Sequence, residues 1–294
     1  MPRVALVTYD PRPEPSKDRD LPGLRAALEA AGAEADVVCW DDDTADWASY
    51  DLAVLRSTWD YSWRAAEFTA WAERCGKLTR LANPVSVVRW NTDKRYLGEL
   101  AAAGVPTVPT RYLAPGDTEA LAGLPGDHEY VVKPTSGAGA RYAARYTPDR
   151  REAVERHLAR MHAEGLTAMV QPYMRAIDTG GERALQFFGG RLLHASRKRA
   201  VLDPGTAFDA DKVAHPGLEQ WTPTRAELAV AESALAAVPD APELLYARVD
   251  LVDGDDGEPR VMELELVEPN LFLFLHPESV PAVVAAILAA AGTP

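Results

Sequence analysis

The chain has 294 residues, of which 47% are hydrophobic and 26% are charged, a globular composition that excludes a disordered or fibrous protein. Its 31 lysines and arginines against 44 aspartates and glutamates give a net charge of −13, so nucleic acid is not expected as a partner. The most apolar stretch, residues 280–291, is too short to cross a bilayer, so no membrane partner is expected either.

The two cysteines and the start of the chain indicate a cytoplasmic protein. Cys39 and Cys75 are interpreted as reduced, buried thiols, because two cysteines in a chain of this length provide no disulfide framework. Residues 1–10 enter a strand-like run directly, without the basic and apolar segments of a signal peptide.

The first 90 residues alternate between strand and helix patterns. Strands are predicted at residues 4–8, 36–40 and 51–56, and helices at residues 21–31 and 67–75. This alternation indicates an α/β fold with a parallel sheet covered by helices. The loop after the first strand has no glycine pattern, which disfavours a dinucleotide site there.

Ligands of parallel sheets bind beyond the carboxyl ends of the strands. Tyr9 follows the first strand, and Arg56, Ser57 and Thr58 follow the third. These residues are candidates for binding substrate, and the Arg56 guanidinium fits the two oxygens of a carboxylate. An interdomain salt bridge or a capping network is an equally weighted alternative for Arg56.

From residue 91 the pattern changes. Asn91 is predicted to cap a helix over residues 91–104. The segments that follow are strands at 107–113, 129–133 and 141–146, a helix at 147–165, a strand at 168–174, two strands around residues 189–190, a helix at 223–238, a long hairpin and a helix at 280–291.

A small-residue loop follows Lys133. Ser136, Gly137, Ala138 and Gly139 would let backbone N–H groups fold over an anion, with the lysine as the positive charge. The lysine precedes the glycines and a strand follows them, so this is not a Walker A loop. A glycine-rich hairpin with an exposed lysine is the alternative.

The hairpin near the end of the chain carries an acidic pattern. Period-2 alternation places Arg248 and Asp250 on one face, with Glu263 and Glu265 on the same face of the return strand and Met262, Leu264 and Leu266 on the apolar face. Like charges across a ladder are destabilising, and a hard divalent cation such as Mg²⁺ would reverse that effect. A solvated acidic face is the alternative.

A proline interrupts the strand that contains Gln171, Tyr173 and Met174. A chain crossing between two lobes here could offer backbone groups to an adenine edge, with Met174 against the ring; a proline bulge in an edge strand is the alternative.

A basic group follows in the next strands, at Arg183, Arg197 and Lys198. It would supply the local positive field that phosphate and a substrate carboxylate need, unless it is a solvated face.

Together these segments resemble the ATP-grasp superfamily, and most closely its bacterial glutathione synthetase-like branch, over residues 83–271. The resemblance implies an ATP-grasp fold with a Rossmann-like preceding domain. It divides the chain into an N-terminal α/β substrate-side domain (1–90), a central ATP-grasp lobe (91–170) and a C-terminal ATP-grasp lobe with the metal site (171–294).

The resemblance also implies roles for individual residues. Lys94 in NTDKRYL and Lys133 match the nucleotide-phosphate lysines, and residues 136–139 match the mobile loop. Gln171, Tyr173 and Met174 match the adenine hinge, and Asp250, Glu263 and Glu265 match the Mg²⁺ ligands. The candidate catalytic residues are Arg183, which matches the arginine after the family's GD-type turn, either Arg197 or Lys198, which matches a later arginine that faces phosphate, and Arg248, which resembles the arginine that stabilises the tetrahedral intermediate.

Two positions depart from the family pattern. Glu265 stands where the family often has Asn, and its extra negative charge could tune metal affinity or leave only one ion firmly bound. The turn reads GGER, which leaves the ribose contact open between Asp178 and Glu182.

The implied activity is that of an ATP-dependent carbon–nitrogen ligase, which forms an acyl phosphate from a small amino-acid carboxylate before a nitrogen attacks. VALVTYDP, RSTWDY, RWNTDKRYL and ELELVEPNLF are most similar to the small ATP-grasp enzymes typified by O-ureido-D-serine cyclo-ligase, which form D-cycloserine by intramolecular attack. The alternatives are an intermolecular ligase of the glutathione synthetase or glutamate-ligase type, and a non-catalytic nucleotide-binding scaffold.

The resemblance also sets expectations for cofactors and partners. They are ATP, two Mg²⁺ ions that Mn²⁺ can replace, a small amino-acid-like substrate and assembly into a homodimer or homotetramer.

Overall fold

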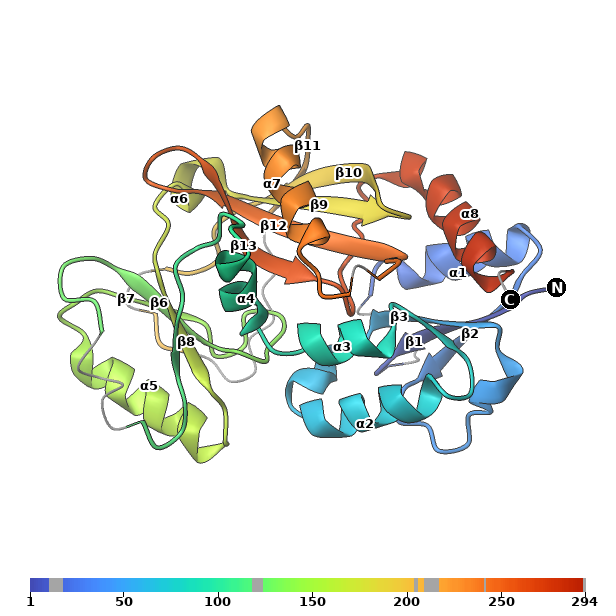
Figure 1. Cartoon of the computed structure of the whole chain (residues 1–294), viewed down its shortest axis with the longest axis horizontal. Coiled ribbons are helices and arrows are strands. Elements are labelled where there is room, and N and C mark those ends of the chain that lie inside the picture. Colours follow the sequence, from blue (N-terminus) through green and yellow to red (C-terminus); the bar gives the residue numbers. More distant parts are fainter. Residues whose placement is uncertain (11–17, 118–123, 204–205, 209–216, 241, 293–294) are drawn as a thin grey trace.

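The computed structural model describes residues 1–10, 18–117, 124–203, 206–208, 217–240 and 242–292. Three β-sheets and the helices packed on them form this part of the chain, as Figure 1 shows. Over the described ranges, no helix is both long and apolar enough to cross a membrane. Much of the predicted loop after the first strand, residues 11–17, lies outside the described residues, as do prolines 204 and 216.

The N-terminal sheet is parallel, with the strand order β2-β1-β3-β4. Alternate side chains of β1 enter two different cores, one shared with α1 and α8 and the other shared with α2. Burial on both faces explains why this strand is a continuous apolar run in the sequence. The elements are β1 (Arg3–Thr8), α1 (Leu21–Ala30), β2 (Glu34–Cys39), η1 (Trp47–Ser49), β3 (Leu52–Ser57), η2 (Trp59–Ser62), α2 (Ala65–Cys75) and β4 (Arg80–Ala82).

The last helix, α8 (Val280–Ala291), returns to this sheet. Val283 and Ile287 of α8 share a core with Leu24 and Leu28 of α1. The two helices lie side by side in Figure 1, near the point where both chain ends are found. The sequence grouped residues 280–291 with the C-terminal lobe, whereas the helix covers the N-terminal sheet.

The central sheet is antiparallel, with the order β5-β8-β6-β7, and α5 packs on one face. Three of its strands, β5, β7 and β8, are shorter than predicted. Ala140 and Tyr142 adopt left-handed backbone angles (φ 60° and 57°), which end the extended run before β7, and Thr107 forms only an isolated bridge with Val261. The elements are β5 (Arg111–Leu113), β6 (Tyr130–Pro134), β7 (Ala144–Tyr146), α5 (Arg151–Ala163) and β8 (Ala168–Pro172).

The C-terminal sheet is antiparallel, with the order β11-β10-β9-β12-β13. Helix α7 covers one face, and a capping box between Thr224 and Glu227 begins this helix. The opposite face carries the charged side chains of the candidate site. The elements are β9 (Glu182–Phe188), β10 (Arg191–Lys198), β11 (Leu218–Trp221), α7 (Arg225–Ala236), β12 (Tyr246–Asp253) and β13 (Pro259–Glu265).

Of the helix predicted at residues 91–104, the structure contains α4 (Tyr96–Ala102), and a turn separates it from the preceding helix α3 (Val85–Asn91). Asn91 therefore ends a helix and does not cap one. Its side-chain amide donates to the Leu264 carbonyl at 2.8 Å and its oxygen accepts from the Leu266 N–H at 2.7 Å. These bonds to β13 replace the expected cap. Two further short helices are α6 (Ile177–Gly180) and η3 (Pro277–Ser279).

Candidate active site

The hairpin of β12 and β13 brings acidic side chains together on the face opposite α7. Its register pairs Asp250 with Glu263 and Arg248 with Glu265. Arg248 donates from Nε to Asp250 Oδ1 at 2.8 Å and from Nη2 to Asp250 Oδ2 at 2.7 Å, and it also contacts Glu265. The convergence predicted from the alternation is therefore observed, while the role of these carboxylates as metal ligands stays a prediction.

A β-bulge changes the direction of one hairpin residue. Val261, not Met262, lies opposite Leu251 and enters the core beneath α7. Met262 packs instead against the cluster that contains Met174. The prediction that Met262 shares a face with Leu264 is wrong, because a bulge adds one residue to the strand and reverses the alternation.

Lys94 and Lys133 approach these carboxylates from two other elements. Lys94, in the turn between α3 and α4, has its Nζ 3.2 Å from Glu263 Oε1 and donates to the Gly137 carbonyl at 2.7 Å. Lys133, on β6, makes no side-chain hydrogen bond or ion pair with any residue that the structure describes. Burial lowers the pKa of the Lys133 ammonium, and Glu263 opposes that shift only in part.

Lys198 adds a further cation, at the end of β10. Its Nζ donates to Asp250 Oδ2 at 2.7 Å and contacts Glu182. Of the two alternatives in the sequence, Lys198 and not Arg197 lies in the charged site. Arg197 points to the other face, where it contacts Glu219 and lies over the Trp221 ring at 5.2 Å.

Arg183 is also absent from this site, contrary to the prediction. It follows Glu182 by one position and so projects toward α7. Its Nε donates to Glu227 Oε1 at 2.7 Å, and its other nitrogens contact Asp253 and the Gly181 carbonyl. Arg183 therefore closes a buried ionic contact behind the sheet.

Burial shapes the charge state of the acidic groups. It raises the pKa of Glu265, with Glu263 and Asp250 adding to the shift and Arg248 offsetting part of it. Burial also opposes the charge of Asp250, but Arg248 and Lys198 outweigh it and hold the pKa of Asp250 well below its usual range. The cations of the protein thus compensate the charge of Asp250 but do not fully compensate a charge on Glu265.

The small-residue loop after β6 lies over Lys94. The Gly137 carbonyl accepts from Lys94, and the Ser136 hydroxyl is buried without a partner in the part of the chain that the structure describes. Gly139 has a left-handed φ of 62°, and the Ala138 carbonyl accepts from the Arg141 N–H at 3.2 Å. The loop therefore follows a tight path over the cation.

Arg141 connects this loop to the N-terminal domain. Its Nη1 donates to the Ser62 carbonyl at 3.4 Å, and its guanidinium lies 4.9 Å from the Trp63 ring centroid. The loop is thus docked on η2. Lys94, Arg248 and Asp250 are at most 6% exposed. The Glu263 and Glu265 side chains are 22% and 23% exposed, so the site is largely buried but keeps an open side at these carboxylates.

The predicted hinge residues lie at the end of β8. Gln171 donates to the Thr110 hydroxyl at 2.9 Å, and the Tyr173 N–H donates to the Glu129 carbonyl at 2.8 Å. Met174 packs with Val108, Val252 and Met262. These side chains give the hinge an apolar neighbour of the kind that an adenine ring requires.

The two candidates for the ribose contact lie in different surroundings. Asp178 accepts from the Tyr173 hydroxyl and lies 3.5 Å from Arg145, beside the hinge. Glu182 lies beside Lys198 among the charged groups, where burial raises its pKa. The assignment between the two stays a prediction.

The candidates for substrate binding lie where the N-terminal sheet meets the segment after β13. Arg56 is fully buried and donates from both Nη atoms to the Pro269 carbonyl at 3.2 Å, with Asp18 at 3.6 Å. The contact with Pro269 is an interdomain hydrogen bond and not the expected interdomain salt bridge, because the ion-pair partner Asp18 belongs to the N-terminal domain itself. Ser57 donates to Thr8 at 2.9 Å; Thr58 is buried, and the Tyr9 ring lies 6.2 Å from Trp59.

Glu268 and Tyr61 were not among the predicted site residues. The Tyr61 hydroxyl hydrogen-bonds the Glu268 carboxyl, and both side chains are buried near Glu263. A signal was present in the sequence, because Glu268 is the third glutamate of ELELVE and Tyr61 lies in RSTWDY.

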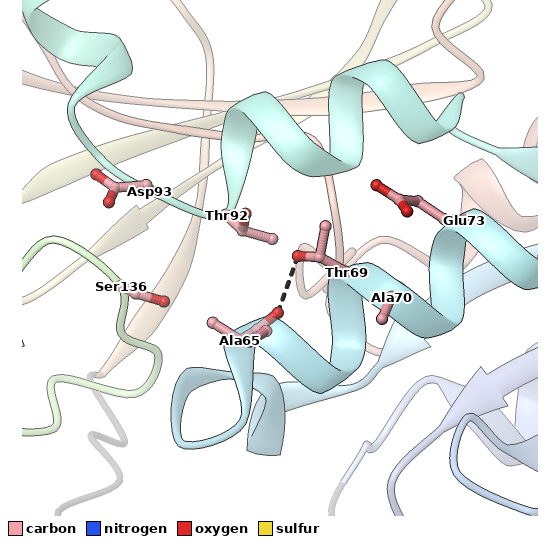
Figure 2. A pocket seen from close by; sticks show the side chains of 8 residues that line it. Ala65, Thr69, Ala70, Glu73, Thr92, Asp93 and Ser136 are labelled. Carbon is pink, nitrogen blue, oxygen red and sulfur yellow. Dashed lines mark hydrogen bonds between the residues drawn. The ribbon is translucent and has the colours of Figure 1, made fainter. Parts of the chain in front are cut away.

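An open cleft of about 400 Å³ lies between α2 and the small-residue loop, shown in Figure 2. Thr69, whose hydroxyl donates to the Ala65 carbonyl, lines one side, and Asp93 and Ser136 line the other. The charged residues of the site do not line this cleft. Its lining includes Thr92 and Asp93, which precede Lys94 in the sequence, but not Lys94 itself, so the volume of this cleft does not locate the site.

Comparison with known proteins agrees with this arrangement. The family model described as D-cycloserine synthetase DcsG, N-terminal domain, matches residues 4–83. A curated relative, the cycloserine biosynthesis protein DcsG of Streptomyces lavendulae, is 41% identical over 273 residues, which are 87% of this chain and 88% of the relative. The chain belongs to the DcsG family.

Solved structures agree with the family and the fold. The crystal structure of D-cycloserine synthetase DcsG matches with a TM-score of 0.89 and 38% identity over 98% of this chain and 99% of that one. A RimK domain ATP-grasp protein from Sphaerobacter thermophilus (TM-score 0.67, 21% identity, 98% of each chain) has the same fold. So does D-alanine–D-alanine ligase from Bacillus anthracis (0.70, 17%, 99% and 97%). The predicted ATP-grasp fold is confirmed.

Proposed function

We propose that this protein is an ATP-dependent carbon–nitrogen ligase that cyclises O-ureido-D-serine to D-cycloserine and releases ADP and phosphate. The carbamoyl group of the ureido substituent, which the product lacks, leaves by hydrolysis as carbon dioxide and ammonia. The observation that carries the proposal is the convergence of Lys94, Lys133 and Lys198 with the β12–β13 carboxylates in one largely buried site. Membership of the DcsG family supplies the substrate class, since the relatives are named for cycloserine synthesis.

The acidic residues fit Mg²⁺ by their donor chemistry. Among the described residues, no three acidic or histidine side chains are arranged as a metal site, because Asp250, Glu263 and Glu265 each turn toward a cation of the protein. Carboxylate oxygens are nevertheless the donors that Mg²⁺ takes. A divalent ion would favour the charged form of Glu265, whose pKa is raised by burial and further by Glu263 and Asp250. When bound, Mg²⁺ would neutralise phosphate charge; two ions, with Mn²⁺ as a substitute, are part of the proposal.

Lys94, Lys133 and the small-residue loop would hold the phosphates of ATP. Phosphoryl transfer depends on positioning and charge stabilisation more than on covalent chemistry by the protein. The substrate carboxylate attacks the γ-phosphoryl group to give an acyl phosphate and ADP. The loop, docked through Arg141, would exclude the water that otherwise hydrolyses the acyl phosphate.

Arg248 would bind the oxyanion that develops when the substrate nitrogen attacks the acyl carbon. Its guanidinium is buried and fixed by Asp250, so its orientation is set before the reaction. Lys198, held by the same carboxylate, would face the transferred phosphoryl group. Arg183 and Arg197 have no part in this account.

The remaining predictions belong to the same proposal. Gln171, Tyr173 and Met174 would hold adenine, and Asp178 or Glu182 the ribose. Ser57, Thr58 and Tyr9 would lie on the substrate side. A cytoplasmic location agrees with the two free cysteines, and assembly into a homodimer or homotetramer is expected.

The test is an ADP-release assay with ATP, Mg²⁺ and O-ureido-D-serine, with product detection by mass spectrometry. We expect ADP and a cyclised product without a second amine. ADP release that requires a second amine would indicate an intermolecular ligase. ADP release that does not depend on O-ureido-D-serine would reject the proposed substrate.

A further inference from the structure

The N-terminal domain and β12 together hold the segment after β13, residues 266–270, in place. Asn83 donates to the Leu266 carbonyl at 2.8 Å, and Arg56 donates to the Pro269 carbonyl at 3.2 Å. Tyr246 donates to the Val267 carbonyl at 2.9 Å. Glu268 therefore sits on a backbone that is fixed on both sides, at the junction between the substrate-side domain and the charged site.

Glu268 is the site carboxyl that lacks a cation. Its side chain accepts from the Tyr61 hydroxyl, is 6% exposed, and makes no ion pair with any residue that the structure describes. Asp250, Glu263 and Glu265 each have a lysine or arginine within 4 Å. A buried carboxylate without a cation is costly, and a bound cation would remove that cost.

The surroundings of Glu268 distinguish it from the candidate metal ligands. Asp250 and Glu263 face each other across the β12–β13 ladder, whereas Glu268 lies beyond the strand and contacts Tyr61 of η2. Tyr61 is itself stacked on Phe68 at 5.2 Å, so its hydroxyl is held by the N-terminal domain. The contact therefore joins Glu268 to the domain expected to bind substrate.

Glu268 is also close to the position expected for the reacting acyl group. Arg248 Nη1 lies 3.5 Å from the Asn270 carbonyl, two residues beyond Glu268. Burial raises the pKa of the Glu268 carboxyl, and the Lys94 charge and, less strongly, the Arg248 charge oppose that shift. An α-amino acid carries its amino group on the carbon next to its carboxyl. With the substrate carboxyl at Arg248, the amino group is one carbon away from that carboxyl, in the same buried, charged site to which Glu268 belongs.

We propose that Glu268, held by Tyr61, binds the positively charged α-amino group of the substrate and so selects amino acids over simple carboxylic acids. This inference rests on the proposed ligase function and adds a specificity residue to it. Tyr61 is a positioning residue, because it acts through the orientation of Glu268.

The experiment compares O-ureido-D-serine with 3-(ureidooxy)propanoate, which lacks only the α-amino group. ADP release is measured for wild type, Glu268→Gln and Tyr61→Phe. Tyr50→Phe is the matched control, since the Tyr50 hydroxyl makes a similar bond to Asp36 at 3.1 Å in the N-terminal domain, outside the site. Thermal melting checks folding, and the KM for ATP and the Mg²⁺ requirement are measured in parallel.

We expect Glu268→Gln to lower kcat/KM for O-ureido-D-serine about 100-fold, mainly through KM, and to leave kcat/KM for the analogue unchanged. The amine preference should be lost with it. Tyr61→Phe should produce a smaller change in the same direction, and Tyr50→Phe none. The KM for ATP should not move.

Equal losses on both compounds would overturn the proposal, as would a shifted Mg²⁺ requirement, which would make Glu268 a metal ligand. Wild-type enzyme that treats both compounds alike would also overturn it. Wild-type enzyme that rejects O-ureido-D-serine but accepts another α-amino acid over its des-amino analogue would contradict the proposed substrate and support the role of Glu268.

Discussion

The two faces of the C-terminal sheet use charge in opposite ways. Behind the sheet, Arg183 is enclosed by Glu227, Asp253 and a backbone carbonyl, and α7 covers this contact. In front, Lys133 has no ion pair among the described residues and burial raises the pKa of Glu265. On the back face, the charge of Arg183 is compensated by residues of the protein. On the front face, we expect the charges of Lys133 and Glu265 to be compensated only when charged ligands bind.

Adjacent residues of the same strand illustrate this difference. Arg197 lies behind the sheet and Lys198 in front of it, so that neighbouring cations have unrelated surroundings. A basic pair in the sequence is therefore not evidence that both cations serve one site. Because successive side chains of a strand point to opposite faces of the sheet, only one of the two cations can lie in the site.

The largest expected effect separates these neighbours. Lys198→Met should lower ADP release between about 100- and 1,000-fold, because a cation aimed at developing phosphoryl charge is lost. Arg197→Met should change it less than about threefold, since its half-exposed ion pair contributes under about 1 kcal/mol. Steady-state assays with both variants provide the test. Equal losses of activity in the two variants would contradict the assignment of the catalytic site to the front face alone.

The next effect concerns stability. Arg183→Met leaves Glu227 buried without its cation and should lower the free energy of unfolding by about 3 kcal/mol. Denaturant unfolding measures this change. At a temperature where the variant is folded, kcat should stay within about threefold of wild type. A large fall in kcat with unchanged stability would place Arg183 in the site after all.

The smallest effect tests the far end of the front face, where His194 on β10 is buried and neutral. Its Nδ1 lies 2.8 Å from the Ser279 hydroxyl, its Nε2 lies 2.8 Å from the Leu271 carbonyl, and its ring stacks on His276 at 4.1 Å. Burial lowers the pKa of His194 to about 4, and a charge on His276 adds to this shift. The hydrogen bond to the Leu271 carbonyl and the charge of Glu278, which lies beside His276, oppose it.

Because the unfolded chain binds a proton near pH 6.5 and the folded protein only near pH 4, stability should fall as the pH drops through this range. The contribution of His194 is about 2 kcal/mol by pH 5. Urea unfolding at pH 7 and pH 5 should show this loss in wild type and a smaller one in His194→Gln. An identical pH dependence in both proteins would contradict a neutral, buried His194.

The sequence predicted those parts of the site that depend on local period. Asp250, Glu263 and Glu265 follow from alternation in one hairpin, and Lys133 with its small residues from one strand and its loop. The ATP-grasp resemblance then supplied Lys94, which no local pattern marks.

What the sequence missed depends on long-range contacts. The bulge that turns Met262 out of the core is visible only once β12 and β13 are paired. Asn91 fits a helix cap until β13 offers it two backbone partners. Glu268 gains its significance from Tyr61, which lies about 200 residues earlier in the chain. Contacts between distant segments decide these positions, and no short window contains them.

The most direct test of the account is calorimetric titration of wild type and Lys133→Met with the Mg²⁺ complex of a non-hydrolysable ATP analogue. Lys133 has no ion pair among the described residues, so methionine should leave the melting temperature unchanged or raise it. We predict that the variant binds the nucleotide at least about tenfold more weakly than wild type. Equal affinity in the two proteins would contradict the claim that these lysines and the acidic hairpin close around one magnesium-bound nucleotide.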